Sequence, residues 1–312
     1  MDAVAVVLEA PERLGLKRLA LRAPAPGDVV VATRYSGVST GTERLLYSGR
    51  MPPFPGMGYP LVPGYEAVGE VVAAGAETGL RAGEIVFVPG ANCYEDARGL
   101  FGAAASHLIA PAKRVMALPL GLAEEGVLLA LAATAMHALA GGEVAPDLII
   151  GHGVLGRLIA RIALAEGRAA PIVWETNPAR RAGASGYKVV APDTDERRDY
   201  RAIYDASGDC NVLDAAIARL APGGEVVLAG FYDHRLSFSF PPAFMREARI
   251  RIAAEWKPAD LIETVALLET GRLRLDGLIT HHRAASDAEA AYRTAFENSA
   301  CLKMVLDWKG AA

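Results

Sequence analysis

A glycine-rich segment in the middle of the chain has the spacing of a dinucleotide-binding turn. Residues 151–156 follow the pattern G-x-G-x-x-G between an apolar run and an amphipathic stretch. Glycines there permit a tight turn and let a pyrophosphate approach the N-terminus of the following helix, whose free N–H groups attract anions. His152 faces the phosphates by position, although a solvated or helix-capping histidine explains it equally well. The expected phosphate site consists of Gly151, His152, Gly153, Val154, Leu155 and Gly156.

An acidic residue stands where such a turn needs one. Glu175 follows Gly156 by 19 residues and ends the next expected strand, where a carboxylate accepts hydrogen bonds from an adenosine ribose. Thr176 and Arg180 belong to the same expected cofactor site. The carboxylate repels a 2′-phosphate, which favours NAD over NADP, whereas Arg180 or Arg181 could turn toward such a phosphate. We therefore predict NAD as the cofactor.

The apolar pattern that must position this turn predicts two kinds of domain. Short apolar runs alternate with turn residues through the first third of the chain, which is typical of a mostly antiparallel, barrel-like β domain. These runs are residues 3–9, 28–38, 66–74, 84–88 and 105–110. After Pro119, strands at 147–151, 171–175, 202–206 and 225–229 alternate with helices at 154–166 and 211–220. This second pattern predicts an α/β fold with a doubly wound parallel Rossmann sheet.

Composition and charge argue against several other classes of protein. The chain has 312 residues, of which 52% are apolar, enough for two domains with sizeable cores. A net charge of -4 gives no attraction to nucleic acid. The N-terminus lacks the basic residues of a signal peptide, and the apolar stretch 126–142 is too short to span a bilayer, so it predicts a buried helix. Three widely separated cysteines indicate no disulfide framework. We expect a cytoplasmic protein without stable membrane insertion.

The domain order and two local segments resemble the medium-chain dehydrogenase/reductase superfamily. Residues 60–69 are similar to its Gly-His-Glu segment, and residues 37–43 to the segment that begins Gly-x-Cys-Gly-x-Asp in its zinc enzymes. The resemblance implies a GroES-like substrate domain over 1–120, an NAD-binding Rossmann domain over 121–258 and a C-terminal return to the first domain over 259–312. It also implies a homodimer through the last Rossmann strand, near 249–254.

The zinc ligands of that superfamily are missing from both segments. Ser39 stands at the position of the ligand cysteine and Tyr65 at that of the ligand histidine, while residues 129–134 supply no third thiolate. A catalytic zinc needs three protein ligands from Cys, His, Asp or Glu, and hydroxyls with a pKa near 10 or above are poor substitutes. Glu66 alone does not make a site. We therefore expect no metal, and the resemblance is to the zinc-free branch.

Longer segments are similar to the 3-hydroxyethyl bacteriochlorophyllide dehydrogenase family of bacteriochlorophyll a biosynthesis. They are residues 39–46, 51–66, 88–91, 98–106 and 174–183. This resemblance implies NAD-dependent oxidation of a 3-(1-hydroxyethyl) group to 3-acetyl on a bacteriochlorophyllide-type tetrapyrrole. The resemblance is also compatible with a location at the periphery of the photosynthetic membrane.

Alcohol oxidation needs a proton acceptor as well as a hydride acceptor. The candidates, in segments that border the nicotinamide in this superfamily, are the hydroxyls of Ser39, Thr40, Thr42 and Tyr65. Tyr65 is the first candidate, although an aromatic residue on a strand is also an ordinary packing residue. Glu66, His137 or the cofactor ribose could carry the proton onward, while the apolar stretch around His137 equally suits a core histidine. The conjugated macrocycle delocalises positive charge as hydride leaves, which reduces the need for a Lewis acid.

Residues 50–63 are candidates for the wall of a flat substrate pocket. They are too rich in proline and glycine for a helix and too apolar for an ordinary solvated loop. Methionine and aromatic side chains adapt to planar apolar ligands, and packing of this loop on its own barrel is the alternative. The expected wall residues are Met51, Phe54, Met57 and Tyr59, with Arg44 and Arg50 as partners for a substrate propionate.

Two other functions fit the same sequence features. A zinc-free NAD(P)H-dependent quinone or enone reductase would transfer hydride to a conjugated acceptor with the same fold. A non-catalytic tetrapyrrole carrier would keep a vestigial dinucleotide site and bind pigment without changing the absorbance of the nicotinamide. Activity toward a hydroxyethyl tetrapyrrole with NAD separates both from the dehydrogenase.

Overall fold

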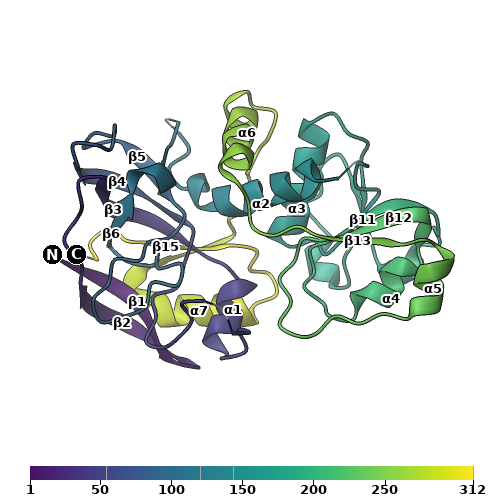
Figure 1. Cartoon of the computed structure of the whole chain (residues 1–312), viewed down its shortest axis with the longest axis horizontal. Helices are drawn as coiled ribbons and strands as arrows, with labels where there is room; N and C mark the ends of the chain where they lie inside the picture. The colour runs from purple at the N-terminus through teal and green to yellow at the C-terminus, as the bar shows by residue number, and fades with distance from the viewer. Residues whose placement is uncertain (54, 120, 143, 312) are drawn as a thin grey trace. The chain divides into compact units, whose positions relative to one another are not determined.

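The computed structural model describes every residue except 54, 120, 143 and 312, and the chain divides into two compact units. The first unit contains Met1–Ala130 and Leu278–Ala312, and the second contains Leu131–Gly277. Figure 1 shows both chain ends in the first unit, purple at the start and yellow at the end. The C-terminal return therefore begins at residue 278 rather than at the expected 259. Helix α6 (Pro258–Glu269) accounts for this difference, because its Asp260 contacts His137 within the second unit.

The first unit is built on antiparallel β-structure, as the alternating pattern predicts. Its larger sheet has, among the described residues, the order β14-β15-β3-β4-β5-β7, with β6 also paired to β3. These strands are His281–Ala284, Met304–Asp307, Asp28–Val38, Ala67–Ala74, Ile85–Val88, Met116–Ala117 and, for β6, His107–Pro111. Only the β14–β15 pair in this sheet is parallel. A second antiparallel pair joins β1 (Asp2–Ala10) to β2 (Arg13–Ala20).

The C-terminal segment completes the sheet of the first unit. Strand β15 pairs antiparallel with β3, so that Met304 lies opposite Val38 at the end where β3 leads into the segment of Ser39. Helix α7 (Ala288–Glu297) buries Ala288, Ala291, Tyr292 and Ala295 in one apolar cluster with Val38 and Met304. Burial of these side chains, at roughly 25 cal/mol per Å² of apolar surface, ties the last residues of the chain to the end of β3.

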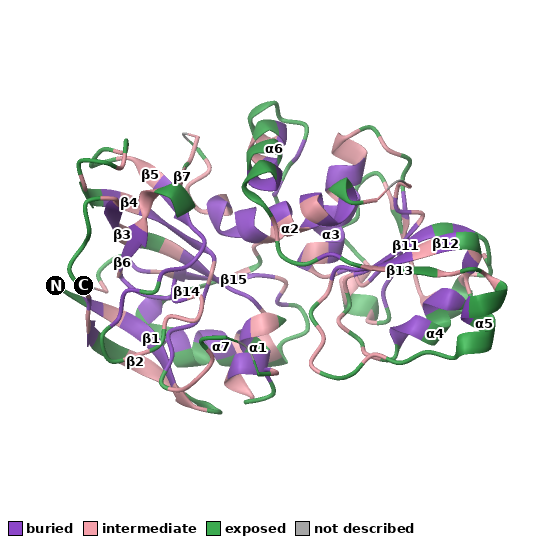
Figure 2. Cartoon of the chain, in the orientation of Figure 1, coloured by how far each residue is buried: buried purple, intermediate pink, exposed green. Residues whose placement is uncertain are grey.

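The second unit has the parallel sheet of a Rossmann fold. Its order is β10-β9-β8-β11-β12-β13, and every pairing between neighbours is parallel. The strands are Lys188–Val190, Ile172–Trp174, Leu148–Ile150, Tyr200–Asp205, Leu220–Leu228 and Arg249–Ile252. Figure 2 shows much of β11 and β12 buried, whereas α5 (Phe240–Met245) is largely exposed. The doubly wound fold predicted from the alternating pattern is therefore confirmed.

The helices include three that the apolar pattern predicts. Helix α3 (Val154–Ala165) buries Leu158, Ile159 and Ile162, which recur at helical spacing along one face. Helix α2 (Leu129–Ala140), preceded by a 3₁₀ turn at Glu125–Leu128, accounts for the buried helix expected near 126–142. Helix α4 (Val212–Ile217) lies within the helix expected at 211–220, and α1 (Thr42–Tyr47) is the remaining α-helix. Within the described residues no helix is long and apolar enough to cross a membrane.

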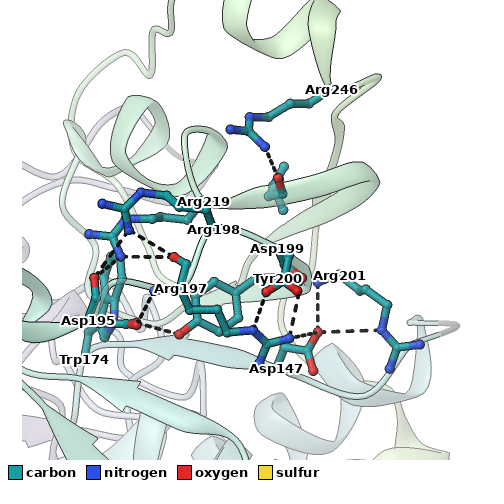
Figure 3. Close-up of polar contacts among 11 residues, drawn as sticks. Asp147, Trp174, Asp195, Arg197, Arg198, Asp199, Tyr200, Arg201, Arg219 and Arg246 are labelled. Atoms are coloured by element: carbon teal, nitrogen blue, oxygen red, sulfur yellow. Dashed lines mark hydrogen bonds and ion pairs between the residues drawn. The ribbon is translucent and has the colours of Figure 1, made fainter.

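A polar network fixes the loop that leads into β11 (Figure 3). Asp195 accepts hydrogen bonds from Trp174 Nε1 at 2.7 Å and from the Tyr200 hydroxyl at 2.5 Å. Arg197 lies over the Tyr200 ring, with its guanidinium carbon 4.3 Å from the ring centroid, and reaches Asp147 at 3.5 Å. These contacts join the residues before β8 and β11 to the end of β9, so we assign the network a structural role in the sheet.

Candidate functional site

The glycine-rich turn lies between β8 and α3, where the sequence places it. Gly151 has a φ of 96°, a conformation that L side chains rarely adopt, and its N–H donates to Trp174 O at 2.9 Å. A Cβ at Gly156 would lie 1.9 Å from Gly151 O, so only glycine lets the helix approach the turn this closely. A Cβ at Gly153 would meet nothing within 4 Å, and no side chain caps α3 there. The open N–H groups at this helix start fit a dinucleotide pyrophosphate.

The structure brings Glu175 to this turn. The carboxylate is buried at 8% exposure, and it accepts the His152 N–H at 3.1 Å and the Asn177 N–H at 2.8 Å. Because a carboxylate offers about four acceptor positions, Glu175 keeps acceptor capacity for ribose hydroxyls. Thr176 is exposed beside it. The Arg181 guanidinium donates to Glu175 O and Thr176 O, so in this structure it is held against the backbone at the end of β9.

His152 is a buried structural histidine. Its Nδ1 lies 2.6 Å from Arg180 O and its Nε2 lies 2.9 Å from the Tyr187 hydroxyl. Burial lowers the pKa of His152 to about 4, so the ring is neutral at physiological pH. Neither a solvated nor a helix-capping histidine describes this geometry, because both ring nitrogens are engaged with residues 180–187. His152 instead ties the glycine-rich turn to that segment, and Arg157 reinforces the tie by donating to Arg180 O and Ala182 O.

In the first unit, Ser39 and Tyr65, which stand at the positions of the zinc-ligating cysteine and histidine of the superfamily, contact each other. Ser39 follows β3 directly, and its Oγ forms a short hydrogen bond with the Tyr65 hydroxyl in which either atom can donate. The Tyr65 hydroxyl also lies 3.4 Å from Thr42 Oγ1. Gly64, with a φ of 94°, turns the chain immediately before Tyr65 and accepts the Ala103 N–H. Three candidate hydroxyls are thus brought together, while Thr40 lies beside them half-buried.

Phe101 holds the Tyr65 ring from the side. The two ring centroids are 5.1 Å apart with the planes at 67°, an edge-on arrangement that aromatic pairs favour. Phe101 has a φ of 70°, which is uncommon for a residue with a side chain, and its carbonyl accepts the Ala91 N–H at 2.6 Å. Sequence reasoning placed no function on Phe101, since nothing in its local pattern predicts a left-handed conformation.

Two buried carboxylates flank the hydroxyl cluster. Glu66 is fully buried and receives Lys303 Nζ at 2.8 and 2.6 Å, and a Cβ on Gly37 would lie 2.2 Å from its Oε2. Glu43 is also fully buried and accepts the Ser39 N–H at 2.9 Å and the Tyr292 O–H at 2.6 Å. Sequence reasoning identified Glu66 as a site residue. It missed Glu43, Lys303 and Tyr292, because no motif marks them.

Burial controls the protonation of this cluster. It raises the pKa of Glu43 to about 7, and it raises the pKa of Glu66 against the opposing effect of the Lys303 ammonium. Burial, together with the neighbouring Glu66 carboxylate, also raises the pKa of Tyr65 above its usual range. The Tyr65 hydroxyl therefore stays neutral at physiological pH, and it can take up a proton only while passing its own to a neighbour.

The expected relay partners differ in how they meet these hydroxyls. Glu66 directs both carboxylate oxygens to Lys303. His137 belongs to the second unit, where its Nδ1 lies 2.9 Å from Asp260 Oδ2. The ring is partly exposed, so His137 is a histidine hydrogen-bonded to Asp260 at the surface of α2 rather than a residue of an apolar core.

The expected wall residues mostly pack on their own unit. Met51, Met57 and Tyr59 join an apolar cluster with Leu8, Leu45, Leu46 and Leu61, and the Tyr59 hydroxyl donates to Leu46 O at 2.5 Å. Met57 and Tyr59 keep partial exposure, while Met51 is buried. Arg44 and Arg50 are exposed at the end of α1 and after it. Phe54 lies outside the described residues.

The donor atoms near Tyr65 do not suit zinc. The positions of the two ligands offer a serine and a tyrosine hydroxyl, and the nearest carboxylates are held by Lys303 and Tyr292. Across the described ranges 1–53, 55–119, 121–142 and 144–311, no group of three or more His, Cys, Asp or Glu residues could hold a metal ion.

Elemental analysis of the purified protein is therefore expected to find no stoichiometric zinc. The physical reason is that neutral hydroxyls bind Zn²⁺ too weakly to replace a thiolate and an imidazole. Turnover is also expected to withstand prolonged treatment with a chelator. One zinc per chain, with activity that is lost on chelation and restored by zinc, would contradict this prediction.

Comparison with known proteins agrees with the two-unit architecture. The alcohol dehydrogenase GroES-like domain matches residues 25–120. An alcohol dehydrogenase from Escherichia coli complexed with NADH has a TM-score of 0.83 at 20% identity, over 98% of this chain and 99% of that one. The fold and the GroES-like domain define a medium-chain dehydrogenase/reductase, an oxidoreductase of the alcohol dehydrogenase kind.

Two curated relatives identify the family within that class. They are the 2-desacetyl-2-hydroxyethyl bacteriochlorophyllide A dehydrogenases of Cereibacter sphaeroides and Rhodobacter capsulatus. Each is 59% identical to this chain, and each alignment covers all of both proteins. The chain belongs to the 2-desacetyl-2-hydroxyethyl bacteriochlorophyllide A dehydrogenase family, so the resemblance seen in the sequence is confirmed.

Proposed function

We propose that this protein oxidises the 3-(1-hydroxyethyl) group of a bacteriochlorophyllide to 3-acetyl with NAD, without a catalytic metal, in bacteriochlorophyll a biosynthesis. Family membership at 59% identity over the whole chain supports the substrate. The glycine-rich turn and Glu175 support a nicotinamide dinucleotide as cofactor. In the balanced reaction, the carbinol carbon loses a hydride and its oxygen loses a proton, giving the ketone, NADH and one proton.

The observation that carries the mechanism is the hydroxyl pair of Tyr65 and Ser39. A bound nicotinamide supplies the hydride acceptor. The chain's own residues handle the proton: Tyr65 Oη accepts it from the alcohol while passing its own proton to Ser39 Oγ, and Ser39 in the same step releases its hydroxyl proton to water. The raised pKa of Tyr65 requires this coupled transfer, because burial disfavours a free phenolate. Thr42 offers a second hydroxyl for proton exchange with Tyr65.

The function is tested by incubating the protein with NAD and 3-hydroxyethyl bacteriochlorophyllide. We expect NADH to appear in one-to-one ratio with a red-shifted 3-acetyl product. Reduction of a quinone or enone by NADPH, without oxidation of the hydroxyethyl pigment, would identify a reductase instead. Pigment binding without any change in nicotinamide absorbance would identify a carrier.

Glu175→Gln is expected to weaken NAD binding by roughly 1 to 3 kcal/mol, since charge-assisted hydrogen bonds to ribose hydroxyls are replaced by neutral ones. Its affinity for NADP should fall less, because the carboxylate that repels a 2′-phosphate is gone. Calorimetric titration of both dinucleotides measures the two changes. Glu263→Gln, which neutralises an exposed carboxylate on α6 in the same unit, is the matched control. Unchanged affinity for both cofactors would remove Glu175 from the ribose site.

An exposed apolar surface in the second unit supports the expected homodimer. Phe231, Phe238, Phe240, Phe244, Met245, Ile250 and Ile252 are exposed within one stretch of 22 residues, 231–252. Strand β13 lies at the end of the strand order, so one of its edges has no partner strand in the described sheet. Unpaired edges with exposed apolar residues favour pairing with another chain.

Light scattering of the wild-type protein is expected to give a mass near twice 32.8 kDa, and the Ile252→Asp variant is expected to give a mass near that of one chain.

Peripheral membrane association is a further part of the proposal, and sedimentation with anionic vesicles tests it. A monomer that binds vesicles through the 231–252 surface would contradict the dimer and assign this surface to the membrane.

A further inference from the structure

Glu43 makes an unusual set of contacts for a carboxylate. It lies in the first turn of α1, with 0% of its surface exposed, and both of its oxygens are engaged. Oε1 accepts the Ser39 N–H at 2.9 Å, while the Glu43 N–H donates to Ser39 O at 3.0 Å. Oε2 accepts the Tyr292 O–H at 2.6 Å, from a helix 249 residues further along the chain. Ser39 is thus held through both its N–H and its C=O by one residue.

Helix capping alone does not explain a buried acid at this position. An exposed aspartate or serine caps a helix without the desolvation cost that a fully buried carboxylate carries. The ammonium of the cluster, Lys303, directs its hydrogen bonds to Glu66. Glu43 is instead stabilised by two hydrogen-bond donors, and one of them belongs to Ser39, whose Oγ contacts the Tyr65 hydroxyl. The contacts therefore form a chain from Tyr292 through Glu43 and Ser39 to Tyr65.

We propose that Glu43 and Tyr292 are positioning residues for the oxidation, which hold Ser39 so that its Oγ stays against the Tyr65 hydroxyl. This inference rests on the proposed role of Tyr65 as proton acceptor. Neither residue touches the substrate in this scheme. Their effect is on the geometry of proton transfer, and displacement of a reacting group by about 1 Å costs up to roughly 100-fold in rate.

The first experiment measures kcat and KM for variants in which Glu43 or Tyr292 is substituted. Glu43→Ala is expected to lower kcat by roughly 10- to 100-fold with little change in KM, because transition-state geometry is lost and ground-state binding is kept. Glu43→Gln keeps an oxygen for the Ser39 N–H and should retain most of the turnover. Tyr292→Phe should lower kcat by roughly 3- to 10-fold, since one of the two anchors of Glu43 remains.

A matched control separates positioning from general loss of stability. Trp308 Nε1 donates to Ser36 Oγ at 2.8 Å, so Ser36→Ala also removes a buried hydrogen bond between β3 and the C-terminal segment. Ser36→Ala is expected to leave kcat unchanged even where its melting temperature falls as far as that of Tyr292→Phe. An equal loss of kcat in both variants would make the Glu43–Tyr292 contact merely structural and overturn the proposal.

The deciding experiment repeats the substitutions in a Tyr65→Phe background. If Glu43 acts through Tyr65, then adding Glu43→Ala or Tyr292→Phe to Tyr65→Phe should not lower kcat below that of Tyr65→Phe alone. The same fold-loss in both backgrounds would overturn the proposal while leaving the role of Tyr65 intact. Full turnover by Tyr65→Phe alone would instead reject the proton-acceptor assignment, and with it this role of Glu43. Tyr292→Phe carries the test if Glu43→Ala fails to fold.

Discussion

Tyr65→Phe is expected to lower kcat by roughly 10²- to 10⁴-fold, the usual contribution of a positioned proton acceptor. The substitution keeps the ring and its edge-on contact with Phe101, and it removes only the hydroxyl that meets Ser39 and Thr42. The dissociation constant for NAD should stay nearly constant, because the proposed contacts to adenosine and pyrophosphate belong to the glycine-rich turn and Glu175. Steady-state kinetics with the hydroxyethyl pigment, combined with titration of NAD, measure both quantities.

The outcome also distinguishes Tyr65 from its neighbours. Ser39→Ala removes the hydroxyl that receives the proton and should lower kcat as well, whereas Thr42→Val, whose partner lies 3.4 Å away, should have a smaller effect. A loss confined to KM in Tyr65→Phe would mean that Tyr65 positions the macrocycle in the ground and transition states alike. Full activity in Tyr65→Phe with a large loss in Ser39→Ala would move the proton-accepting role to Ser39.

The glycine-rich turn could be predicted from the sequence because its determinants are local. Two of the three glycines are needed by the backbone itself, since Gly151 has a positive φ and a Cβ at Gly156 would collide with Gly151 O. Glu175 follows from the length of one helix and one strand in a βαβ unit. The fold class rests on the same kind of periodicity, and the solved structures with this fold confirm it.

The surroundings of Tyr65 could not be predicted, because they depend on contacts between distant parts of the chain. Lys303 lies 237 residues from Glu66, in a segment with no motif, and a lone lysine is usually an exposed residue. The start of the C-terminal return was also placed too early, because the sequence of α6 carries no mark of which unit it joins. The partner of His137 could not be predicted either. The apolar stretch around His137 contains no sign of Asp260, which lies 123 residues further along the chain.

Lys303→Met is expected to destabilise the protein by about 3 to 5 kcal/mol, since it leaves the Glu66 carboxylate buried without its ion-pair partner. Lys303 is 1% and Glu66 0% exposed at the side chain, so water cannot replace the ammonium. Methionine keeps most of the length and apolar volume of the lysine stem. Urea denaturation of the variant and the wild type measures the difference in the free energy of unfolding. The exposed pair of Arg34 and Glu70 provides the control, where Arg34→Met should cost at most about 1 kcal/mol.

The pH dependence of this loss identifies its cause. Burial raises the pKa of Glu66, and removal of Lys303 takes away the interaction that opposes this shift. A carboxyl whose folded-state pKa lies above its unfolded value binds more protons in the folded state, so stability falls as pH rises between the two values. Lys303→Met should therefore lose more stability at pH 8 than at pH 5. Lys303→Met combined with Glu66→Gln should recover part of the loss at pH 8, because no charge remains buried. A loss that is equal at both pH values and unchanged by Glu66→Gln would assign it to packing of the lysine stem instead of the ion pair.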